Sequence, residues 1–390
     1  MSRHAITGAL VFDGTTAPPL PSHTVVWAGD RIIWMGPDSD AHTADAATVD
    51  AGGASLLPGL IDAHVHLCLE PTIEGTDGVA SDTIETLLAR SVDNAGKLLA
   101  AGITSARDQG SRDGIAIEVA AAQQAGKVVG ARIMAAGRGI TPTGGHGWTI
   151  GVEADGPAEV RAAVMTEIER GADVIKLFPT GGVLGSGTHG FEVVMSMEEL
   201  KAAVDEAHRH DVLVGAHIHG PEGIEMGLDA GVDTIEHATG ITADQARRAA
   251  AQGVALVPTL TGIDVMRDRA DLVPADLLSR VTEVAEAASA GIRIAIAAGA
   301  RVLAGTDSGT PFNPPGLMAR EMQLLAGLGM GNAGAIAAAT SLVADTLRLK
   351  GRGTIEVGAY ADLILVDGNP LEDLSVLEQP RMVVQDGVAR

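Results

Sequence analysis

The sequence predicts an α/β fold of the (β/α)8 TIM-barrel type, with a small β-sandwich domain built from both ends of the chain. Between about residues 58 and 349, short apolar runs alternate eight times with stretches of helical composition. Eight such units in this length are typical of a barrel. Both ends of the chain lack the alternation and hold short β-rich runs instead. No G-x-G-x-x-G motif opens a helix after the first strand, which disfavours a doubly wound open sheet.

The end segments are β-rich and punctuated by Gly, Pro and Asp, which favour turns. Their predicted strands are 5–12, 23–28, 31–35, 361–367 and 381–385. We expect the strands from the two ends to pair in one sheet layer. Residues 1–57 and 350–390 are therefore predicted to form one composite β-sandwich domain.

The middle of the chain, residues 58–349, supplies the strands and helices of the predicted barrel. The predicted strands are 60–64, 102–106, 131–135, 173–178, 213–217, 232–237, 255–259 and 302–307. The predicted helices are 82–100, 114–126, 157–170, 197–210, 243–252, 275–298 and 333–348. Several of these helices open with Asp, Ser or Pro near the first turn, as helix starts commonly do.

Composition narrows the classes of partner. The 390 residues include 27 Lys+Arg and 50 Asp+Glu, a formal charge of -23, which argues against nucleic acid or an anionic membrane surface. The single cysteine, Cys68, cannot form an internal disulfide, and neither a signal-peptide pattern nor an 18-residue apolar run is present. We expect a cytoplasmic protein, and apolar helix faces make a homo-oligomer compatible with the sequence.

Polar residues end five of the predicted barrel strands, where barrel enzymes carry their catalytic groups. They are His64, His66, Lys176, His217, His219, His237 and Asp307. His64 and His66 are two residues apart, so on a strand both rings point to one side and suit one metal ion. Each signal alone is weak, because a histidine or aspartate at a strand end is more often a packing or capping residue. The whole set predicts a metal site.

Eight segments carry a resemblance to a known family. PGLIDAHVH (58–66), IKLFPTGG (175–182), GAHIHG (215–220), IEHAT (235–239) and AGTDSG (304–309) resemble the amidohydrolase superfamily. GITSARDQG (102–110) and RGITPTGGHG (138–147) resemble its imidazolonepropionase-related branch, especially the prolidase-like metallocarboxypeptidases. The end segment 351–374 is similar to that of the superfamily, so the resemblance spans essentially the whole chain.

The resemblance implies a site for two divalent metal ions, for which mixed nitrogen and oxygen ligands favour zinc over manganese, iron or cobalt. His64, His66 and Asp307 would bind the more buried ion, and His217 and His237 the more exposed one. Lys176, carboxylated by CO2 on its ε-nitrogen, would bridge the two. A metal-bridging hydroxide would attack the amide carbonyl, with Asp307 passing its proton to the leaving nitrogen.

This reading predicts hydrolysis of an amide-type C–N bond in a small molecule, an N-acyl amino acid or a dipeptide-like compound. The summed charge of such a site is +1, which would attract a substrate carboxylate. Opening of a cyclic amide, and hydrolysis of a carbamate, urea, lactone or organophosphate, use the same attack and stay open. A non-catalytic scaffold is the alternative from another class, and the complete ligand set disfavours it.

Further residues near the strand ends are candidates for contact with the substrate. His146 and His219 are candidate catalytic and substrate-binding groups, and His189 lies on the loop 181–194. Arg107 and Arg138 could bind a substrate carboxylate or pair with acidic neighbours.

Aromatic residues are scarce, and half of them follow strand ends on the expected catalytic face. These are Trp148, Phe178, Phe191 and Phe312, which could wall a pocket for an apolar or aromatic group. Related peptidases often carry a tyrosine in the loop after the strand-four lysine. Here Met195 stands near that place and the only tyrosine is Tyr360, so His146, His189 or His219 is the expected replacement donor.

Overall fold

The computed structural model describes residues 2–41, 43–183 and 190–390. Its central strands are parallel and lie in two sheets. One sheet holds β6 (Leu60–Val65), β7 (Ile103–Asp108) and β8 (Arg132–Ala135). The other holds, in sheet order, β10 (Gly151–Glu153), β9 (Gly139–Thr141), β11 (Val174–Leu177), β12 (Leu213–His219), β13 (Thr234–Thr239), β14 (Ala255–Val257) and β15 (Arg301–Val302).

Backbone hydrogen bonds connect these two sheets on both sides. The amide of Ala63 on β6 donates to Ala304 O (3.0 Å), just after β15. On the other side, the amide of Asp173 before β11 donates to Ala135 O at the end of β8 (2.8 Å). The first predicted barrel strand therefore lies beside the last one, as a barrel requires.

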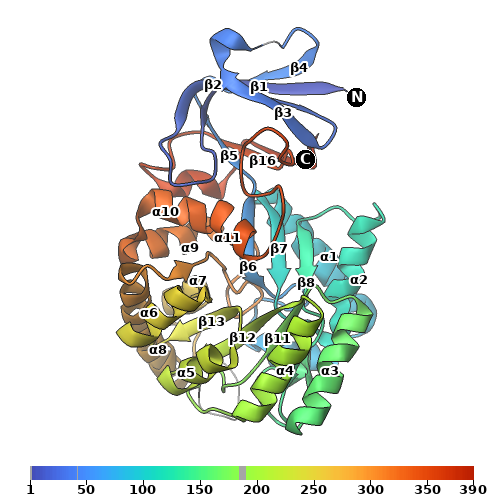
Figure 1. Ribbon diagram of the computed structural model, residues 1–390, viewed down its shortest axis with the longest axis vertical. Helices are drawn as coiled ribbons and strands as arrows, with labels where there is room; N and C mark the ends of the chain where they lie inside the picture. Colours follow the sequence, from blue (N-terminus) through green and yellow to red (C-terminus); the bar gives the residue numbers. More distant parts are fainter. Residues whose placement is uncertain (1, 42, 184–189) are drawn as a thin grey trace.

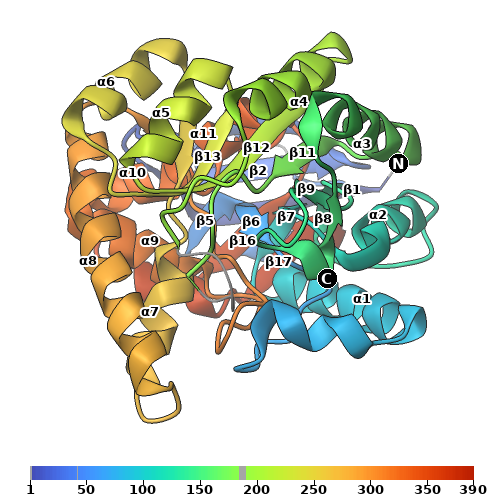
Figure 2. The same ribbon diagram turned by 90° about the horizontal axis from the view of Figure 1, so that it is seen from below.

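The helices lie around the outside of these strands, as Figure 2 shows. They are α1 (Ile84–Ala100), α2 (Ile115–Gln124), α3 (Gly156–Arg170), α4 (Met197–Arg209), α5 (Pro221–Ala230), α6 (Ala243–Gln252), α7 (Leu260–Asp268), α8 (Ala275–Ala297), α9 (Met318–Leu325), α10 (Gly331–Ala338) and α11 (Ser341–Thr346). Shorter helical turns are η1 (Asp38–Asp40), η2 (Gly75–Ser81), η3 (Arg112–Gly114), η4 (Trp148–Ile150), η5 (Ala326–Met330) and η6 (Leu374–Glu378). The largest apolar cluster lies between strands and helices.

All eight predicted barrel strands are present, but three helices were not predicted. Helix α5 was missed because two of its ten residues are glycines, which have low helix propensity. Those glycines let the helix approach the sheet, since a Cβ on Gly227 would lie 2.6 Å from Ile218 Cδ1. The segments of α7 and α9 were not assigned to any predicted helix or strand. The predicted helix 333–348 is two helices, α10 and α11.

The two ends of the chain share one sheet, as predicted, and Figure 1 shows it above the central strands. Its strands are β1 (Arg3–Val11), β2 (Leu20–Ala28), β3 (Arg31–Pro37), β4 (Ala46–Asp50), β5 (Ser55–Pro58), β16 (Leu363–Val366), β17 (Met382–Gln385) and β18 (Val388–Ala389). The ends meet where β5 pairs antiparallel with β16. This sheet packs around its own apolar cluster, to which both ends contribute.

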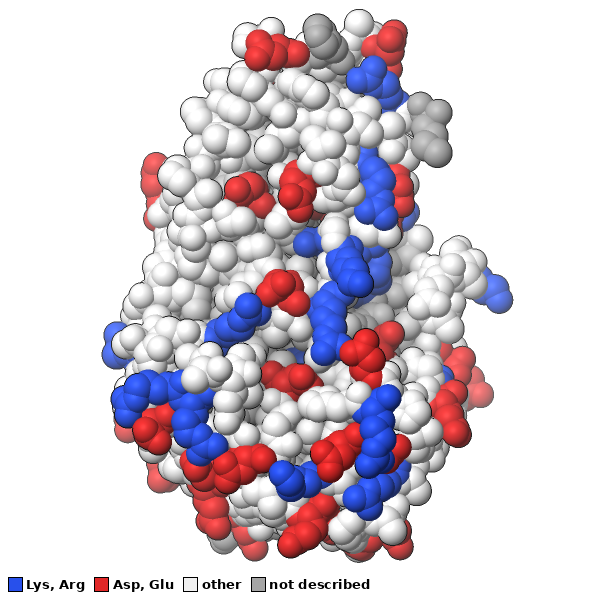
Figure 3. Space-filling view, in the orientation of Figure 1, with Lys and Arg blue, Asp and Glu red and all other residues white. Residues whose placement is uncertain are grey.

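Paired charges stabilise the junction between this sheet and the central strands. Arg132, at the start of β8, and Arg352 both form ion pairs with Asp362 and Asp386 of the C-terminal segment. Figure 3 shows basic and acidic side chains close together in this region of the surface. In the part of the chain that the structure describes, no helix is both long and apolar enough to cross a membrane.

Gly14 joins the N-terminal segment to α11 and to the C-terminal segment. Its carbonyl accepts hydrogen bonds from Thr340 Oγ1 (2.9 Å) and Ser341 Oγ (2.6 Å). Its φ is +92°, and a Cβ would overlap the carbonyl oxygen of Gly353. We expect Gly14→Ala to lower the free energy of unfolding through both backbone strain and overlap.

Gly358 is the matched control, because its φ is +96° but a Cβ there meets nothing within 4 Å. Any loss of stability in Gly358→Ala therefore comes from backbone strain alone. We expect Gly14→Ala to be less stable than Gly358→Ala by about 1–3 kcal/mol, the usual cost of overpacking, in urea denaturation. Equal stabilities would show that the contact between the two end segments does not constrain the fold.

Candidate active site

The carboxyl ends of the parallel strands surround a cavity of about 70 Å³. All six residues expected to bind metal line it, together with His146 and His219. The remaining described lining residues are Ile150, Phe178, Val183, Thr259, Gly262, Ile263, Met266, Val281 and Thr310. The structure thus brings together residues that lie more than 240 positions apart in the sequence, because parallel strands end at one common edge.

His64, His66 and Asp307 form the first cluster of possible metal ligands. The Nε2 atoms of His64 and His66 lie 3.3 Å apart, and 3.3 and 3.4 Å from Asp307 Oδ1. Burial alone would raise the pKa of Asp307, but the neighbouring rings of His64 and His66 outweigh it and hold that pKa well below its usual range. Asp307 is therefore an anion between two imidazoles.

Hydrogen bonds fix which ring nitrogens of this cluster are free. His64 Nδ1 lies 2.8 Å from Glu236 Oε2, and His66 Nδ1 lies 3.0 Å from Gly110 O. A carboxylate and a carbonyl only accept, so both Nδ1 atoms carry the proton. The lone pairs are then on the Nε2 atoms, which face Asp307. This is the arrangement that histidine ligands of metals usually show.

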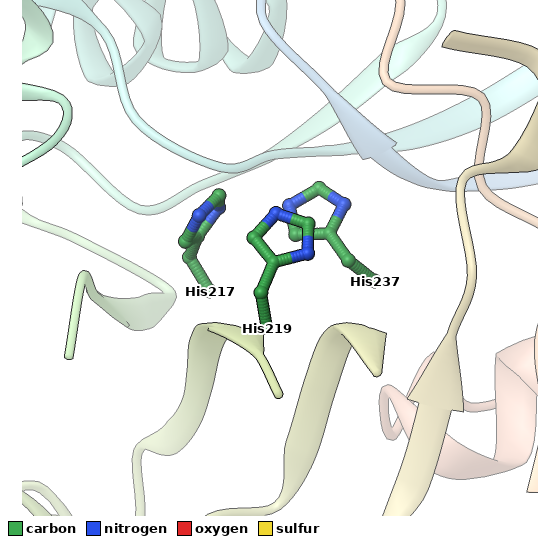
Figure 4. Close-up of side chains that lie close together, drawn as sticks. All are labelled: His217, His219 and His237. Atoms are coloured by element: carbon green, nitrogen blue, oxygen red, sulfur yellow. The ribbon is translucent and has the colours of Figure 1, made fainter. Parts of the chain in front are cut away.

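His217, His219 and His237 form the second cluster, and Figure 4 shows their rings side by side. The ring centroids are 4.5 to 4.8 Å apart. His237 Nδ1 lies 2.7 Å from the hydroxyl of Thr259, which itself donates to Pro258 O, so His237 Nε2 is free. His217 Nε2 lies 3.1 Å from Gly181 O, so its Nδ1 is free.

The end of β13 breaks the alternation of a regular strand. Glu236 and His237 are adjacent, yet both are buried and both take part in this site. The reason is a register shift between β12 and β13, with positive φ angles at His237 (69°) and Ala238 (49°). Non-glycine residues in this conformation cost about 1–3 kcal/mol each and cluster at functional sites. Asp307 and Thr259 have positive φ angles too.

Lys176 lies on β11 and is 1% exposed. Its Nζ has no hydrogen-bond partner among the described residues. Burial lowers the pKa of this amine to about 8, although Glu236 and Asp307 favour the charged form. An unpartnered buried ammonium would be costly, whereas a neutral amine can take up CO2 and become an anionic oxygen ligand. The residue therefore fits the expected bridging role.

Most imidazoles of the site are neutral, as metal ligands must be. Burial, with smaller contributions from Lys176 and neighbouring rings, lowers the pKa of His64 to about 4 and that of His219 to about 3. It holds the pKa of His217 and of His237 well below the usual range. His66 is the exception, since the nearby carboxylate of Asp307 outweighs burial and raises its pKa.

Arg107 does not contact the cavity where a substrate would bind, so its expected substrate role is not supported. It is fully buried, donates to Glu236 Oε1 (2.9 Å) and Thr234 Oγ1 (2.9 Å), and lies behind His64. Arg138 does not line the cavity either, because it pairs with the buried carboxylate of Glu167 (2.6 Å). Each guanidinium group is thus held by a buried carboxylate on a neighbouring element and does not face the cavity.

Only one of the four aromatic residues on this face lines the cavity. Phe178 does so, with its ring centroid 5.2 Å from Lys176 Nζ. Trp148 on η4 is 54% exposed, and Phe191 is 42% exposed with its ring 6.3 Å from that of His219. Phe312 packs against the side of Arg269 and an apolar cluster beside the pocket. His189 lies outside the described residues.

His146 lines the cavity and Met195 does not. The ring of His146 lies 4.4 Å from that of His217 and lines the cavity. Burial, followed by the charge of Lys176, lowers the pKa of His146 to about 4, so its neutral ring has one N–H. Met195 is 2% exposed and packs in the main apolar core.

Several lining residues had no sequence signal that marked them. They include five apolar residues. Val183, Ile263, Met266 and Val281 pack in one apolar cluster, and Ile150 packs in another with Phe178. Ile263 and Met266 lie on α7, which the sequence did not predict, and Val281 lies on α8. Glu236 precedes His237 and would be expected on the opposite strand face. In fact Glu236 lies in the regularly paired part of β13, and it is His237 that the register shift and its positive φ turn inward, which the sequence does not reveal.

Comparison with known proteins agrees with this geometry. A model of the amidohydrolase family matches residues 55–389. Ochratoxinase from Aspergillus niger is 30% identical over 364 residues, which cover 84% of this chain and 73% of that protein. A Xaa-Pro dipeptidase structure with bound methionine in the active site is 30% identical, with a TM-score of 0.91, over 100% of both chains.

A further solved structure, of a prolidase complexed with N-methylphosphonate-L-proline, is 29% identical to this chain. Its TM-score is 0.91, and the match covers 100% of this chain and 99% of that one. The family model spans most of the chain, and the ligand-bearing strand ends lie within the matched range. The chain therefore belongs to the amidohydrolase family and is a hydrolase that acts on amide bonds.

Proposed function

We propose that this chain uses two divalent metal ions, most favourably zinc, to hydrolyse N-acyl amino acids or dipeptide-like substrates. The observation that carries the proposal is the convergence of all six ligand positions on one cavity. The proposal includes a closed (β/α)8 barrel over residues 58–349 and a composite β-sandwich domain from 1–57 and 350–390. The hydrogen bonds between the two parallel sheets and the separate core of the terminal sheet support it.

The donor set fits two ions. His64, His66 and Asp307 would hold one, His217 and His237 the other, and Lys176 as a carbamate would bridge them. The free ring nitrogens, the neutral imidazoles and the unpartnered Nζ of Lys176 support this assignment. When bound, two such ions polarise the substrate carbonyl and make a water molecule acidic enough to attack near neutral pH.

Asp307 is the proton carrier in this proposal. Its Oδ1 lies within 3.4 Å of two ring nitrogens, and its side chain is 14% exposed toward the cavity. The anionic carboxylate can accept a proton from the attacking water and donate it to the nitrogen of the departing amine. The neutral ring of His146 is a donor for the substrate, and His219, held by Thr239 (2.9 Å), is a second one.

A carboxylate on the substrate is supported by the neighbours' ligands. Methionine and N-methylphosphonate-L-proline both carry one, and both are bound by proteins of closely similar fold. Among the described lining residues, Lys176 is the only Lys or Arg, so no guanidinium is proposed to bind it. The net positive charge that two ions would give the site is then the main attraction for the carboxylate.

The apolar wall defines the side chain that the substrate should carry. Ile263 and Met266 on α7 and Val281 on α8 line the cavity with hydrocarbon and pack in one apolar cluster. A charged substrate side chain would lose its hydration there without finding a partner. We therefore propose that aliphatic or aromatic side chains are preferred.

Asp307→Asn tests the function and the proton carrier together. The wild-type chain should hydrolyse N-acetyl amino acids or dipeptides with apolar side chains faster than those with charged ones, and a chelator should abolish this activity. Asp307→Asn should lower kcat by about 10²–10⁴-fold, because the amide cannot accept a proton. Metal content must be measured in the same sample. Near-normal turnover in a fully loaded variant would remove Asp307 from the proton path.

Met266→Ala tests the apolar wall. The side chain of Met266 is fully buried and lines the cavity, so its loss should lower kcat/KM for long apolar substrates by about tenfold. Leu272→Ala is the control, since Leu272 is 48% exposed and does not line the cavity. If both variants keep the wild-type ratio between apolar and charged substrates, the wall does not select the substrate.

A further inference from the structure

Behind the cavity, one buried ion pair connects three strands of the site. Arg107 on β7 donates from Nε to Ala63 O on β6 (2.7 Å) and from Nη2 to Glu236 Oε1 on β13 (2.9 Å). Ala63 directly precedes His64. Both charged side chains are 0% exposed, so the pair is fully removed from water. Such a pair is weak evidence for stability, because desolvation offsets most of its attraction.

The carboxylate of Glu236 has every acceptor position in use. Oε1 accepts from Arg107 and from Thr234 Oγ1 (2.5 Å), and Oε2 accepts from His64 Nδ1 (2.8 Å) and Arg107 Nη2 (3.1 Å). Gly215 on β12 makes the room, because a Cβ there would lie 3.0 Å from Glu236 Oε1. The hydrogen bonds from Thr234, His64 and Arg107 thus fix the orientation of the carboxylate.

His64 differs from the other proposed ligands in the kind of acceptor behind it. His66 and His217 donate to backbone carbonyls, and His237 donates to a threonine hydroxyl. His64 alone donates to a carboxylate. An anionic acceptor favours the Nδ1–H form of the ring and makes its Nε2 a stronger ligand. The two proposed metal positions therefore differ, because only one of them has a ligand backed by a carboxylate.

We propose that Arg107 and Glu236 are positioning residues that fix the tautomer of His64 and so set the metal affinity of the His64–His66–Asp307 site. This inference rests on the two-metal function proposed above. Arg107 acts by holding Glu236, and Glu236 acts by accepting the proton of His64 Nδ1. Neither residue touches the substrate.

Glu236→Gln is the test, and Glu167→Gln is its matched control. Glu167 is also 0% exposed and paired with an arginine, Arg138, but it does not contact a proposed ligand. Each protein is loaded with zinc and bicarbonate and dialysed against increasing chelator, and zinc per chain is measured by elemental mass spectrometry. We expect Glu236→Gln to bind one of its two zinc ions about 10- to 100-fold more weakly and the other as the wild type does.

A second readout needs no metal. In protein labelled with ¹⁵N in histidine, the ring signals that vanish in His64→Asn identify His64. These signals should report the Nδ1–H form in the wild type and in Glu167→Gln, and a mixture of tautomers in Glu236→Gln. A Glu236→Gln protein that keeps both the wild-type tautomer and both zinc affinities would overturn the inference. Equal weakening of both ions would do so as well, since it indicates a merely structural role.

Glu236→Gln leaves the guanidinium of Arg107 buried without a carboxylate, which can prevent folding. The double variant Arg107→Gln/Glu236→Gln removes both charges, and we expect it to show the same loss at one zinc ion. If the wild-type chain binds only one zinc, the two-metal function fails. The inference is then decided by whether that single affinity falls in Glu236→Gln and not in Glu167→Gln.

Discussion

Parallel strands must place their carboxyl ends at one common edge, and the chemistry of this chain depends on that constraint. Five strands each contribute one or two polar residues to the edge, and their side chains meet in a single cavity. The first and last of these strands are hydrogen-bonded through Ala63 and Ala304, which brings Asp307 within 3.4 Å of the two histidines of β6. No local interaction could assemble residues so distant in the sequence.

Burying so many polar side chains together costs free energy, and neighbouring parts of the fold must offset that cost. The positive φ angles at His237 and Asp307 are strained backbone conformations. Such conformations persist only where the surrounding structure stabilises them. Burial keeps most of the imidazoles neutral, and acceptors behind the rings fix which nitrogen stays free. The result is a set of imidazole lone pairs and one carboxylate that face each other. Such a set is suited to divalent ions.

Much of this arrangement could be predicted from the sequence, because alternation and strand ends are visible there. The spacing of His64 and His66 and the lysine within an apolar run pointed to residues that line one cavity. The role of Arg107 stayed open at the sequence level, since a guanidinium near a strand end can bind a substrate carboxylate or pair with an acidic neighbour. Nothing local shows that Glu236 is that neighbour. Glu236 itself was overlooked because alternation allows only one of two adjacent residues to face the site, and His237 was taken to be that residue. The register shift that lets His237 join Glu236 comes from tertiary pairing.

The most direct test of the account is the number of metal ions that the wild-type chain binds. Elemental mass spectrometry on protein purified without chelator, with an intact-mass measurement of Lys176 carboxylation under conditions that preserve the carbamate, gives both quantities. The account predicts two ions per chain and a carboxylated lysine. One ion with an unmodified Lys176, or none after reconstitution with zinc or manganese and bicarbonate, would contradict it.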